Sequence, residues 1–186
     1  ADQKPVYNCL KEVIPLLEED EKLAFVQTPQ FYANTEYSSV ARGAFSQQVV
    51  FYEYICEGKS TNNAMFCCGT NVVLRTQALQ SIGGFDETSV TEDFATFFCG
   101  RPKGWDSLYY NKVFVYGLGP ETLAGYFTQQ MRWAMGTIGV FRKIMPTFFR
   151  HPRALRLRQW WEYALSGSYY FIGWGGGLWR ERYSNR

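Results

Sequence analysis

A short apolar run near residue 25 places the tightest limit on the fold of this chain. Leu23 to Val26 are all apolar, Gln27 follows, and Thr28-Pro29 ends the run. A run this short that stops at a proline is typical of a buried strand followed by a loop. Further short apolar runs that predict strands lie at residues 71–74, 108–110 and 113–116.

Helix-like segments separate these runs. Residues 5–19 repeat apolar side chains at helical spacing, with Pro5 suited to the first turn and Pro15 expected to kink the helix or end it early. Residues 36–57 show an imperfect apolar helical face, and Thr91 can cap a further helix that begins near Glu92. Helices that alternate with short buried strands predict an α/β layer fold.

Composition disfavours several classes of site. The formal net charge of +2 implies no partner through bulk charge. His151 is the only histidine, which disfavours a His-based zinc site and any Ser–His or Cys–His nucleophile. The five cysteines form no C-x-x-C pair, so we expect reduced thiols in a cytosolic setting. The 18% of aromatic residues indicate either a large aromatic core or a surface that stacks on sugars or lies at a membrane interface.

The character of the chain changes after residue 121. No acidic residue lies between Glu121 and Glu162, while basic residues alternate with aromatic and aliphatic ones. Such helix-prone stretches commonly lie along an anionic membrane surface. A solvated helix face and a nucleic-acid patch are the alternatives, but no nucleic-acid motif accompanies the charge, so we expect no nucleic-acid partner. Residues 164–179 are apolar and rich in glycine, and they are shorter than a membrane span requires, which favours an interfacial, re-entrant or truncated membrane segment.

Two short motifs carry the residue types needed for chemistry on a phosphorylated sugar. Thr91-Glu92-Asp93 places two carboxylates beside a hydroxyl, and at the start of a helix the exposed N–H groups and the dipole would favour their ionised forms. Gln129 to Trp133 brings an amide, a guanidinium and an indole together within five residues. A carboxylate can move a proton, a guanidinium suits phosphate, and a flat indole suits a sugar ring.

These motifs belong to an ordered set that resembles the processive family-2 glycosyltransferases. Bacterial cellulose synthase catalytic subunits are the most similar group, and curdlan, hyaluronan and chitin synthases are more distant. The matching blocks, in the family's order, are Val26 to Phe31, Phe66-Cys67-Cys68-Gly69-Thr70, Gly83-Gly84-Phe85, Thr91-Glu92-Asp93 and Gln129 to Trp133 as Q-x-x-R-W. The set spans about residues 1–150 of the 186.

The resemblance implies a fold and a division of the chain. Residues 1–120 would form the C-terminal part of a GT-A-type catalytic domain. Residues 121–160 would form amphipathic interface helices that carry Q-x-x-R-W, and residues 161–186 an interfacial or truncated membrane segment. The chain lacks an initiator Met and the family's earlier uridine-binding strands, so we expect it to be a segment of a longer protein that shows little transfer by itself.

The resemblance also implies roles in the reaction. Asp93 would be the catalytic base and Glu92 would support it. Gln129 and Arg132 would hold the donor diphosphate, and Trp133 would stack on the terminal sugar of the acceptor. The other residues with implied roles belong to the blocks near residues 28 and 68. They are Phe66, Cys68, Gly69 and Thr70 on the acceptor side, and Gln27, Thr28 and Pro29 on the donor side.

A divalent cation is the implied cofactor. Asp2 would supply the last carboxylate of the family's D-x-D motif, which binds Mg²⁺ or Mn²⁺ on the donor diphosphate. An ordinary helix cap is the alternative role for Asp2.

The expected function is inverting transfer of glucose from UDP-glucose to a growing β-1,4-glucan. The expected location is the inner membrane, with the catalytic domain on the cytoplasmic face, membrane lipid as a partner and accessory synthase subunits as further partners. A chitin- or hyaluronan-type synthase is one alternative, because sugar identity rests on few residues. A non-catalytic glycan-binding or membrane-surface module is the other.

Overall fold

Two three-stranded sheets form the centre of the molecule in the computed structural model, which describes residues 3–85, 93, 96 and 104–168. One sheet has the order β1-β6-β3, with strands Gln3–Pro5, Val115–Gly117 and Gln30–Tyr32. The other has the order β4-β2-β5, with strands Val72–Leu74, Leu23–Gln27 and Asp106–Tyr109. Each sheet is mixed, because its central strand pairs parallel on one side and antiparallel on the other.

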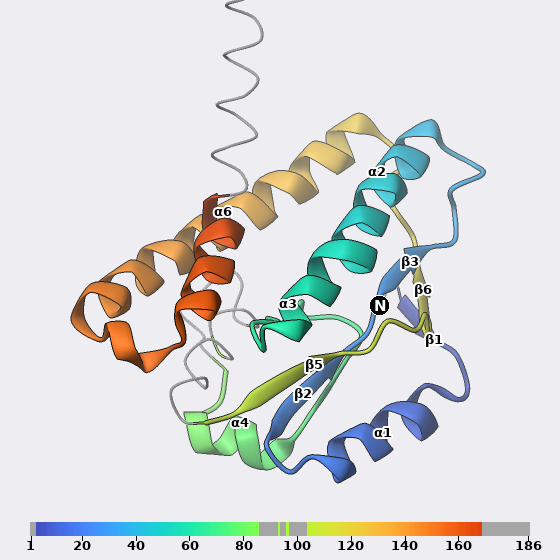
Figure 1. Cartoon of the computed structure of the whole chain (residues 1–186). Helices are drawn as coiled ribbons and strands as arrows, with labels where there is room; N and C mark the ends of the chain where they lie inside the picture. Colours follow the sequence, from blue (N-terminus) through green and yellow to red (C-terminus); the bar gives the residue numbers. More distant parts are fainter. Residues whose placement is uncertain (1–2, 86–92, 94–95, 97–103, 169–186) are drawn as a thin grey trace, which may run out of the picture.

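Strand β2 is the buried strand that the apolar run predicts. All five of its residues are buried, since helices cover the sheet from both sides (Figure 1). Phe25 packs with Tyr52 and Tyr109 on one side. Val26 packs with Val13 and Phe114 on the other. A strand buried on both faces is apolar throughout, which explains why its sequence shows no alternation.

The first helix begins later than predicted. Pro5 lies in β1, opposite Val115 of β6, and α1 runs over Cys9–Glu19. Placing Pro5 in the first turn was therefore wrong. Pro15 neither ends α1 nor is buried, and at this exposed position water can replace the backbone hydrogen bond that proline cannot donate.

The second helical segment explains the imperfect apolar face of residues 36–57. It consists of α2, Ser39–Val50, a π-helical segment over Phe51–Cys56 (η1) and α3, Glu57–Thr61. Ser38 caps it by accepting hydrogen bonds from the backbone N–H groups of the next turn. A π-helical turn contains more residues than an α-helical turn. The apolar positions therefore shift around the helix axis between α2 and α3.

Helix α4, Thr76–Ile82, ends at Gly83, whose φ of 97° places it in the left-handed region that favours glycine. Asp93 and Thr96 lie in helical backbone, whereas Thr91 and Glu92 lie outside the described residues. The cap predicted at Thr91 therefore stays a prediction.

A helical hairpin follows β6. Helix α6 runs over Leu123–Arg150, capped by Thr122, whose hydroxyl accepts from Gly125 N at 3.1 Å. After the 3₁₀ turn Pro152–Ala154 (η3), residues 157–168 form a second helix that returns beside α6 (Figure 1). Within the described ranges, the structure has no helix long and apolar enough to cross a membrane.

The hairpin has its own core and an ionic attachment to the rest of the molecule. Val140 and Ile144 of α6 pack against Trp160 and Tyr163. Lys59 of α3 is 3% exposed, and its Nζ lies 3.1 Å from Glu162 Oε2 and 2.9 Å from Glu162 O. Burial lowers the pKa of Lys59 against the opposing effect of Glu162. Removing Glu162 would leave the buried ammonium of Lys59 without its counter-ion, so the pair fixes where the hairpin docks.

Glycine allows the two helices of the hairpin to approach closely, which can be tested with a matched pair of variants. A Cβ on Gly167 would lie 2.1 Å from Phe141 Cδ2 and 2.8 Å from Phe141 Cβ, whereas a Cβ on Gly139 would meet nothing within 4 Å. We expect Gly167→Ala to lower the free energy of unfolding by about 1–3 kcal/mol through overpacking. Gly139→Ala should raise it by about 0.5–1 kcal/mol through helix propensity.

The midpoint of thermal unfolding, followed by circular dichroism, measures both changes. A Gly167→Ala protein that melts at or above the temperature of Gly139→Ala would contradict the close approach.

Candidate active site

The loop from Phe66 to Asn71 is held in place by one buried side chain. Gln27, at the end of β2, is 0% exposed. Its Nε2 donates to the carbonyl oxygens of Thr70 at 2.7 Å, Thr28 at 3.0 Å and Asn71 at 3.3 Å, and its Oε1 accepts from Cys68 N at 2.9 Å. One amide therefore satisfies several backbone groups of a loop that has no regular partner strand there.

Thr28 and Pro29 are buried beside Gln27. Thr28 Oγ1 donates to Asn71 O at 3.0 Å, and Thr28 N donates to the same oxygen at 2.9 Å. Pro29 is among the fully buried side chains. The sequence predicts that these three residues shape the donor side. In the structure all three are buried, and Gln27 and Thr28 hydrogen-bond to the loop. Any influence on a donor would therefore pass through the loop.

Asp93 lies directly against Gly69 of this loop. A Cβ on Gly69 would lie 2.3 Å from Asp93 Oδ2 and 3.1 Å from Asp93 Cγ, and Gly69 has a φ of 76°. Both the space and the backbone conformation therefore require glycine. The structure brings together two sequence blocks that are more than twenty residues apart, as expected if they form one site.

Cys68 is not equipped to act as a nucleophile. A hydrogen bond with Cys56, burial, and to a lesser extent the charge of Asp93 raise the pKa of the Cys68 thiol well above its usual value. A thiol held neutral in this way is unreactive. Cys68 therefore fits the predicted role of a small wall residue.

Phe66 is anchored on the hairpin side. It packs against the cluster that contains Val140 and Ile144, and its ring centroid lies 6.1 Å from that of Phe51. Lys59 Nζ lies 5.8 Å from the same centroid. Phe66 thus connects the loop at Gly69 to the position of the hairpin.

The Q-x-x-R-W motif lies on α6 with its three named residues on one side of the helix. Gln129, Arg132 and Trp133 are separated by three and four residues, which places them next to one another on a helical surface. Arg132 is exposed, while Gln129 and Trp133 are half-buried. The spacing therefore presents an amide, a cation and an indole together.

Two side chains of β3 connect the loop to this motif. Neither was among the site residues predicted from the sequence. Gln30 Oε1 accepts from Thr70 Oγ1 at 3.2 Å. Tyr32 is buried, its hydroxyl accepts from Gln48 Nε2 at 2.8 Å, and it also hydrogen-bonds with Gln129. Burial raises the pKa of Tyr32 despite these two hydrogen bonds, so the phenol stays neutral. Alternate residues of a strand share a face, so the period of two from Gln30 to Tyr32 is the sequence signal that could have identified them.

Helix α2 adds further contacts to the start of α6. Gln47 Oε1 accepts from Tyr126 Oη at 2.8 Å and from Gln130 Nε2 at 3.3 Å. Gln129 Oε1 is buried and has no hydrogen-bond partner among the described residues. A buried acceptor without a partner is costly, so it marks a place where a donor group of a ligand or water can bind.

The structure does not describe the metal ligand that the sequence predicts, Asp2. Asp2 and Glu92 are both outside the described residues. In the parts of the chain that the structure describes, no group of three or more His, Cys, Asp or Glu side chains could hold a metal ion.

The comparison with protein families decides where the chain belongs. A family model described as glycosyl transferase family group 2 matches residues 1–181. The chain belongs to this family. It is 41% identical over 143 residues to a UDP-forming cellulose synthase catalytic subunit of Dictyostelium discoideum, and 33% identical over 154 residues to the UDP-forming cellulose synthase catalytic subunit of Komagataeibacter sucrofermentans. These matches cover 76% and 81% of this chain, and they span only 13% and 20% of the two relatives.

A solved structure shows the same fold. The mannosyltransferase PcManGT from Pyrobaculum calidifontis, in complex with GDP-Man and Mn²⁺, aligns with a TM-score of 0.54 at 16% identity over 94% of this chain and 52% of that chain. The predicted GT-A-type glycosyltransferase fold is therefore confirmed. The resemblance to the family-2 glycosyltransferases and to cellulose synthase catalytic subunits is confirmed as well.

The dependence of the loop on Gln27 yields a prediction with a pH signature. In Gln27→Glu the carboxylate would face three carbonyl oxygens that now receive hydrogen bonds from Nε2. We expect a loss of about 3 kcal/mol in the free energy of unfolding at neutral pH. The folded protein would favour the protonated acid, so the pKa of Glu at this position would rise and the loss would grow as pH increases through it.

Gln30→Glu is the matched control, because Gln30 accepts rather than donates in its bond to Thr70 and a carboxylate can do the same. Chemical denaturation at a series of pH values measures both variants. Equal stability of the two variants at neutral pH would contradict the role of Gln27.

Proposed function

We propose that the protein containing this chain is a cellulose-synthase-like enzyme that transfers glucose from UDP-glucose to a growing β-1,4-glucan with inversion at the anomeric carbon. The observation that carries the proposal is the placement of Asp93 against Gly69, within blocks that resemble cellulose synthase catalytic subunits. The loop has no side chain at Gly69, where the carboxylate of Asp93 lies. A carboxylate in this position is suited to receive a proton from an acceptor hydroxyl.

Asp93 would act as the base of a single displacement. The oxygen of the acceptor hydroxyl forms the new bond to the anomeric carbon while the bond from that carbon to the diphosphate oxygen breaks. The hydroxyl proton passes to the carboxylate of Asp93, and the electron pair of the broken bond leaves with the diphosphate. Glu92, its neighbour in sequence, would support Asp93 in this role.

Arg132 and Gln129 would bind the leaving diphosphate. A guanidinium fork matches phosphate oxygens, and the charge that builds on the leaving group strengthens this contact in the transition state. Gln129 is oriented by Tyr32, which connects β3 to α6. Tyr32 and Gln48 are therefore positioning residues for the diphosphate side of the site.

The acceptor glucan would lie along the loop and α6. Trp133 offers an indole face for the terminal sugar, and Thr70 is exposed beside Gly69. Cys68 would form part of the wall, and Phe66 would hold the loop against the hairpin.

A divalent cation, Mg²⁺ or Mn²⁺, is part of the proposal. A carboxylate oxygen is the ligand that these hard cations prefer, so Asp2 suits either ion. When bound, the cation would neutralise charge on the donor diphosphate.

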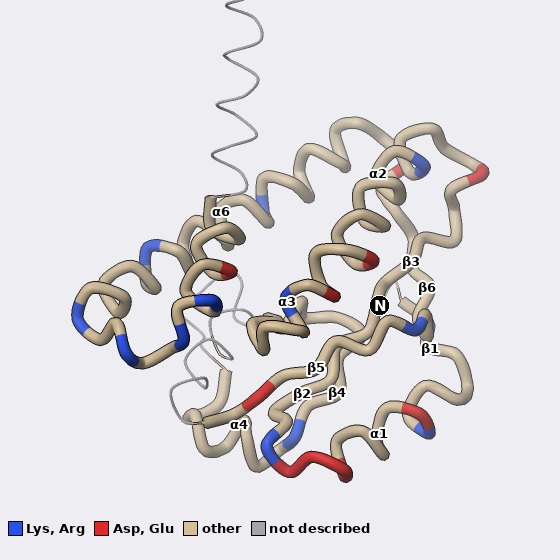
Figure 2. The backbone as a smooth tube through the Cα atoms, viewed as in Figure 1, with Lys and Arg blue, Asp and Glu red and all other residues tan. Residues whose placement is uncertain are grey.

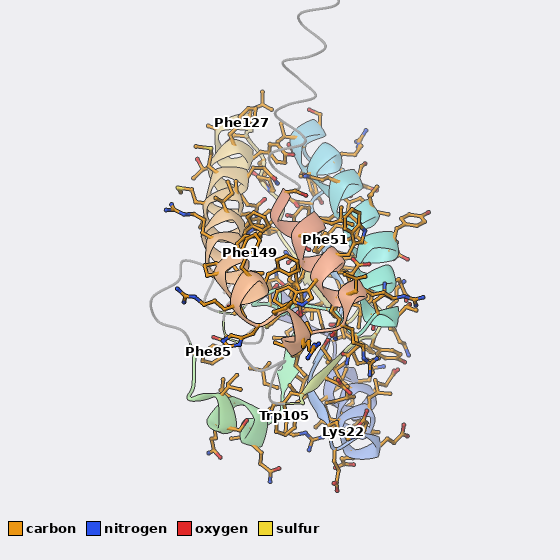
Figure 3. All side chains as sticks on the ribbon, turned by 60° about the vertical axis from the view of Figure 1, so that its left-hand side comes forward. Lys22, Phe51, Phe85, Trp105, Phe127 and Phe149 are labelled. Atoms are coloured by element: carbon orange, nitrogen blue, oxygen red, sulfur yellow. The ribbon has the colours of Figure 1, made fainter. Side chains whose placement is uncertain are left out.

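Helix α6 would lie at a membrane surface, which we propose to be the cytoplasmic face of the inner membrane, where accessory synthase subunits could also bind. A stripe of four apolar side chains, each between 57% and 62% exposed, runs along α6 at intervals of four residues: Leu123, Phe127, Met131 and Met135. Figure 3 shows Phe127 near the N-terminal end of α6. At about 100° per residue, Gln129, Arg132 and Trp133 lie on the other side of α6 from this stripe. The helix can therefore seat on lipid while the motif faces the site.

Replacing the proposed base should abolish most of the transfer. In the full-length protein, Asp93→Asn should lower the rate of polymer formation from UDP-glucose by a factor on the order of 10²–10⁴, with UDP binding retained. Asp20→Asn is the matched control, because Asp20 accepts a hydrogen bond from Lys22 N that an amide oxygen can also accept. Retained synthesis by Asp93→Asn would rule out the assignment of the base.

The diphosphate role of Arg132 is separable from the base. Arg132→Ala in the full-length protein should weaken UDP binding roughly 10–100-fold, because charge-assisted hydrogen bonds are lost. Arg142→Ala removes an exposed arginine from a different side of the same helix and should leave UDP affinity unchanged. Isothermal titration calorimetry with UDP measures both, and equal affinities would exclude Arg132 from the diphosphate site. Comparing UDP-glucose with UDP-N-acetylglucosamine as donors distinguishes a glucan synthase from a chitin- or hyaluronan-type enzyme.

A further inference from the structure

A cavity lies away from the candidate active site. It has a volume of about 510 Å³ and lies between the start of β5 and the turn that joins α6 to the helix at residues 157–168. Trp105 and Asp106 line one side, Arg153 and Arg156 the other, and Asn63 and Gln159 contribute polar groups. Of the candidate site residues that the structure describes, none lines it.

Hydrogen bonds hold the walls of this cavity in place. Gln159 Nε2 donates to Asn63 O at 2.8 Å, and Gln159 Oε1 accepts from Arg156 N at 3.0 Å. Asn63 also hydrogen-bonds to Asp106, and Trp105 Nε1 donates to Ser81 Oγ at 2.8 Å. The cavity is therefore formed by the fold itself, which lowers the entropy that a ligand must lose to bind.

The charge at the cavity favours an anion. Neither guanidinium, of Arg153 or of Arg156, has an ion pair or hydrogen bond within the described part of the chain, and Asp106 is engaged by Asn63. No acidic residue of the sequence lies between Glu121 and Glu162. Figure 2 shows basic positions gathered around the turn after α6. Two unpaired guanidinium forks at the rim of a cavity match the oxygen atoms of a phosphate group.

Apolar side chains beside the two arginines indicate the source of that phosphate. Phe149, Leu157 and Trp161 flank the turn in sequence, and all three are more than 60% exposed. Figure 3 shows Phe149 at the end of α6 opposite to Phe127. Exposed aromatic and aliphatic side chains around basic residues are typical of a segment that inserts at the boundary of headgroups and acyl chains.

We propose that this cavity is a binding site for the phosphate headgroup of an anionic phospholipid, with Arg153 and Arg156 as its ligands and Trp105 as a wall. The proposal rests on the membrane seating of α6 in the proposed function and adds a specific site to it. The site would fix the depth and rotation of the hairpin on the bilayer, beyond what a general basic surface can do.

The test compares two pairs of arginines that carry the same charge. In the full-length protein, Arg153→Gln with Arg156→Gln should lower affinity for phosphatidylcholine vesicles that contain phosphatidylglycerol by about tenfold more than Arg142→Gln with Arg158→Gln. Native mass spectrometry of the detergent-purified proteins should find phosphatidylglycerol retained by the wild type and by the Arg142, Arg158 pair, and lost from the Arg153, Arg156 pair. Equal losses in both pairs, or no retained lipid in the wild type, would overturn the site.

Two further measurements separate this proposal from others. If inorganic phosphate or UDP displaces the retained lipid, the cavity binds a soluble phosphate and the lipid assignment fails. UDP titration of the same samples reports on the candidate active site independently. A wild type that retains phosphatidylglycerol without binding UDP would refute the proposed function and leave the lipid site standing, and UDP binding without lipid retention would do the reverse.

Discussion

The side-chain amide of Gln27 is the interaction on which the candidate active site depends. It emerges from β2, which is buried on both faces, so its position is set by the core of the molecule. From there it hydrogen-bonds to the backbone N–H of Cys68 and the carbonyl oxygen of Thr70, which have no strand partner in this loop. Gly69 lies between those two residues, and Asp93 lies against Gly69. The geometry at the carboxylate therefore follows from a side chain that is itself fully buried.

The two halves of the site are connected through β3 and the hairpin. Gln30 bonds to Thr70 and Tyr32 bonds to Gln129, so one face of a three-residue strand contacts both the loop and the Q-x-x-R-W motif. Phe66 makes a second connection, because it packs into the core of the hairpin. The proposed base, Asp93, and the proposed diphosphate ligands on α6 thus come from separate elements that β3 and Phe66 connect, as precise placement of catalytic groups requires.

The sequence predicted much of the fold because strong local signals were present. The apolar run at Leu23 identified β2 as a buried strand. It misplaced the start of α1, because Pro5 suits an edge strand as well as a first helical turn, and only pairing with Val115 decides between them. The π-helical segment escaped notice because its hydrogen-bond shift follows from packing of the whole molecule. The period of two in β3 pairs Tyr32 with Gln30, but the contact of Tyr32 with Gln48 joins distant segments and leaves no local signal.

The buried pair of Lys59 and Glu162 has a mechanical consequence. Sliding the hairpin by one helical turn would separate the buried ammonium of Lys59 from its counter-ion, which favours a single docking register. Phe66 lies next to Lys59 and packs into the hairpin core. A displacement of the hairpin would therefore be passed to the loop at Gly69 through Phe66.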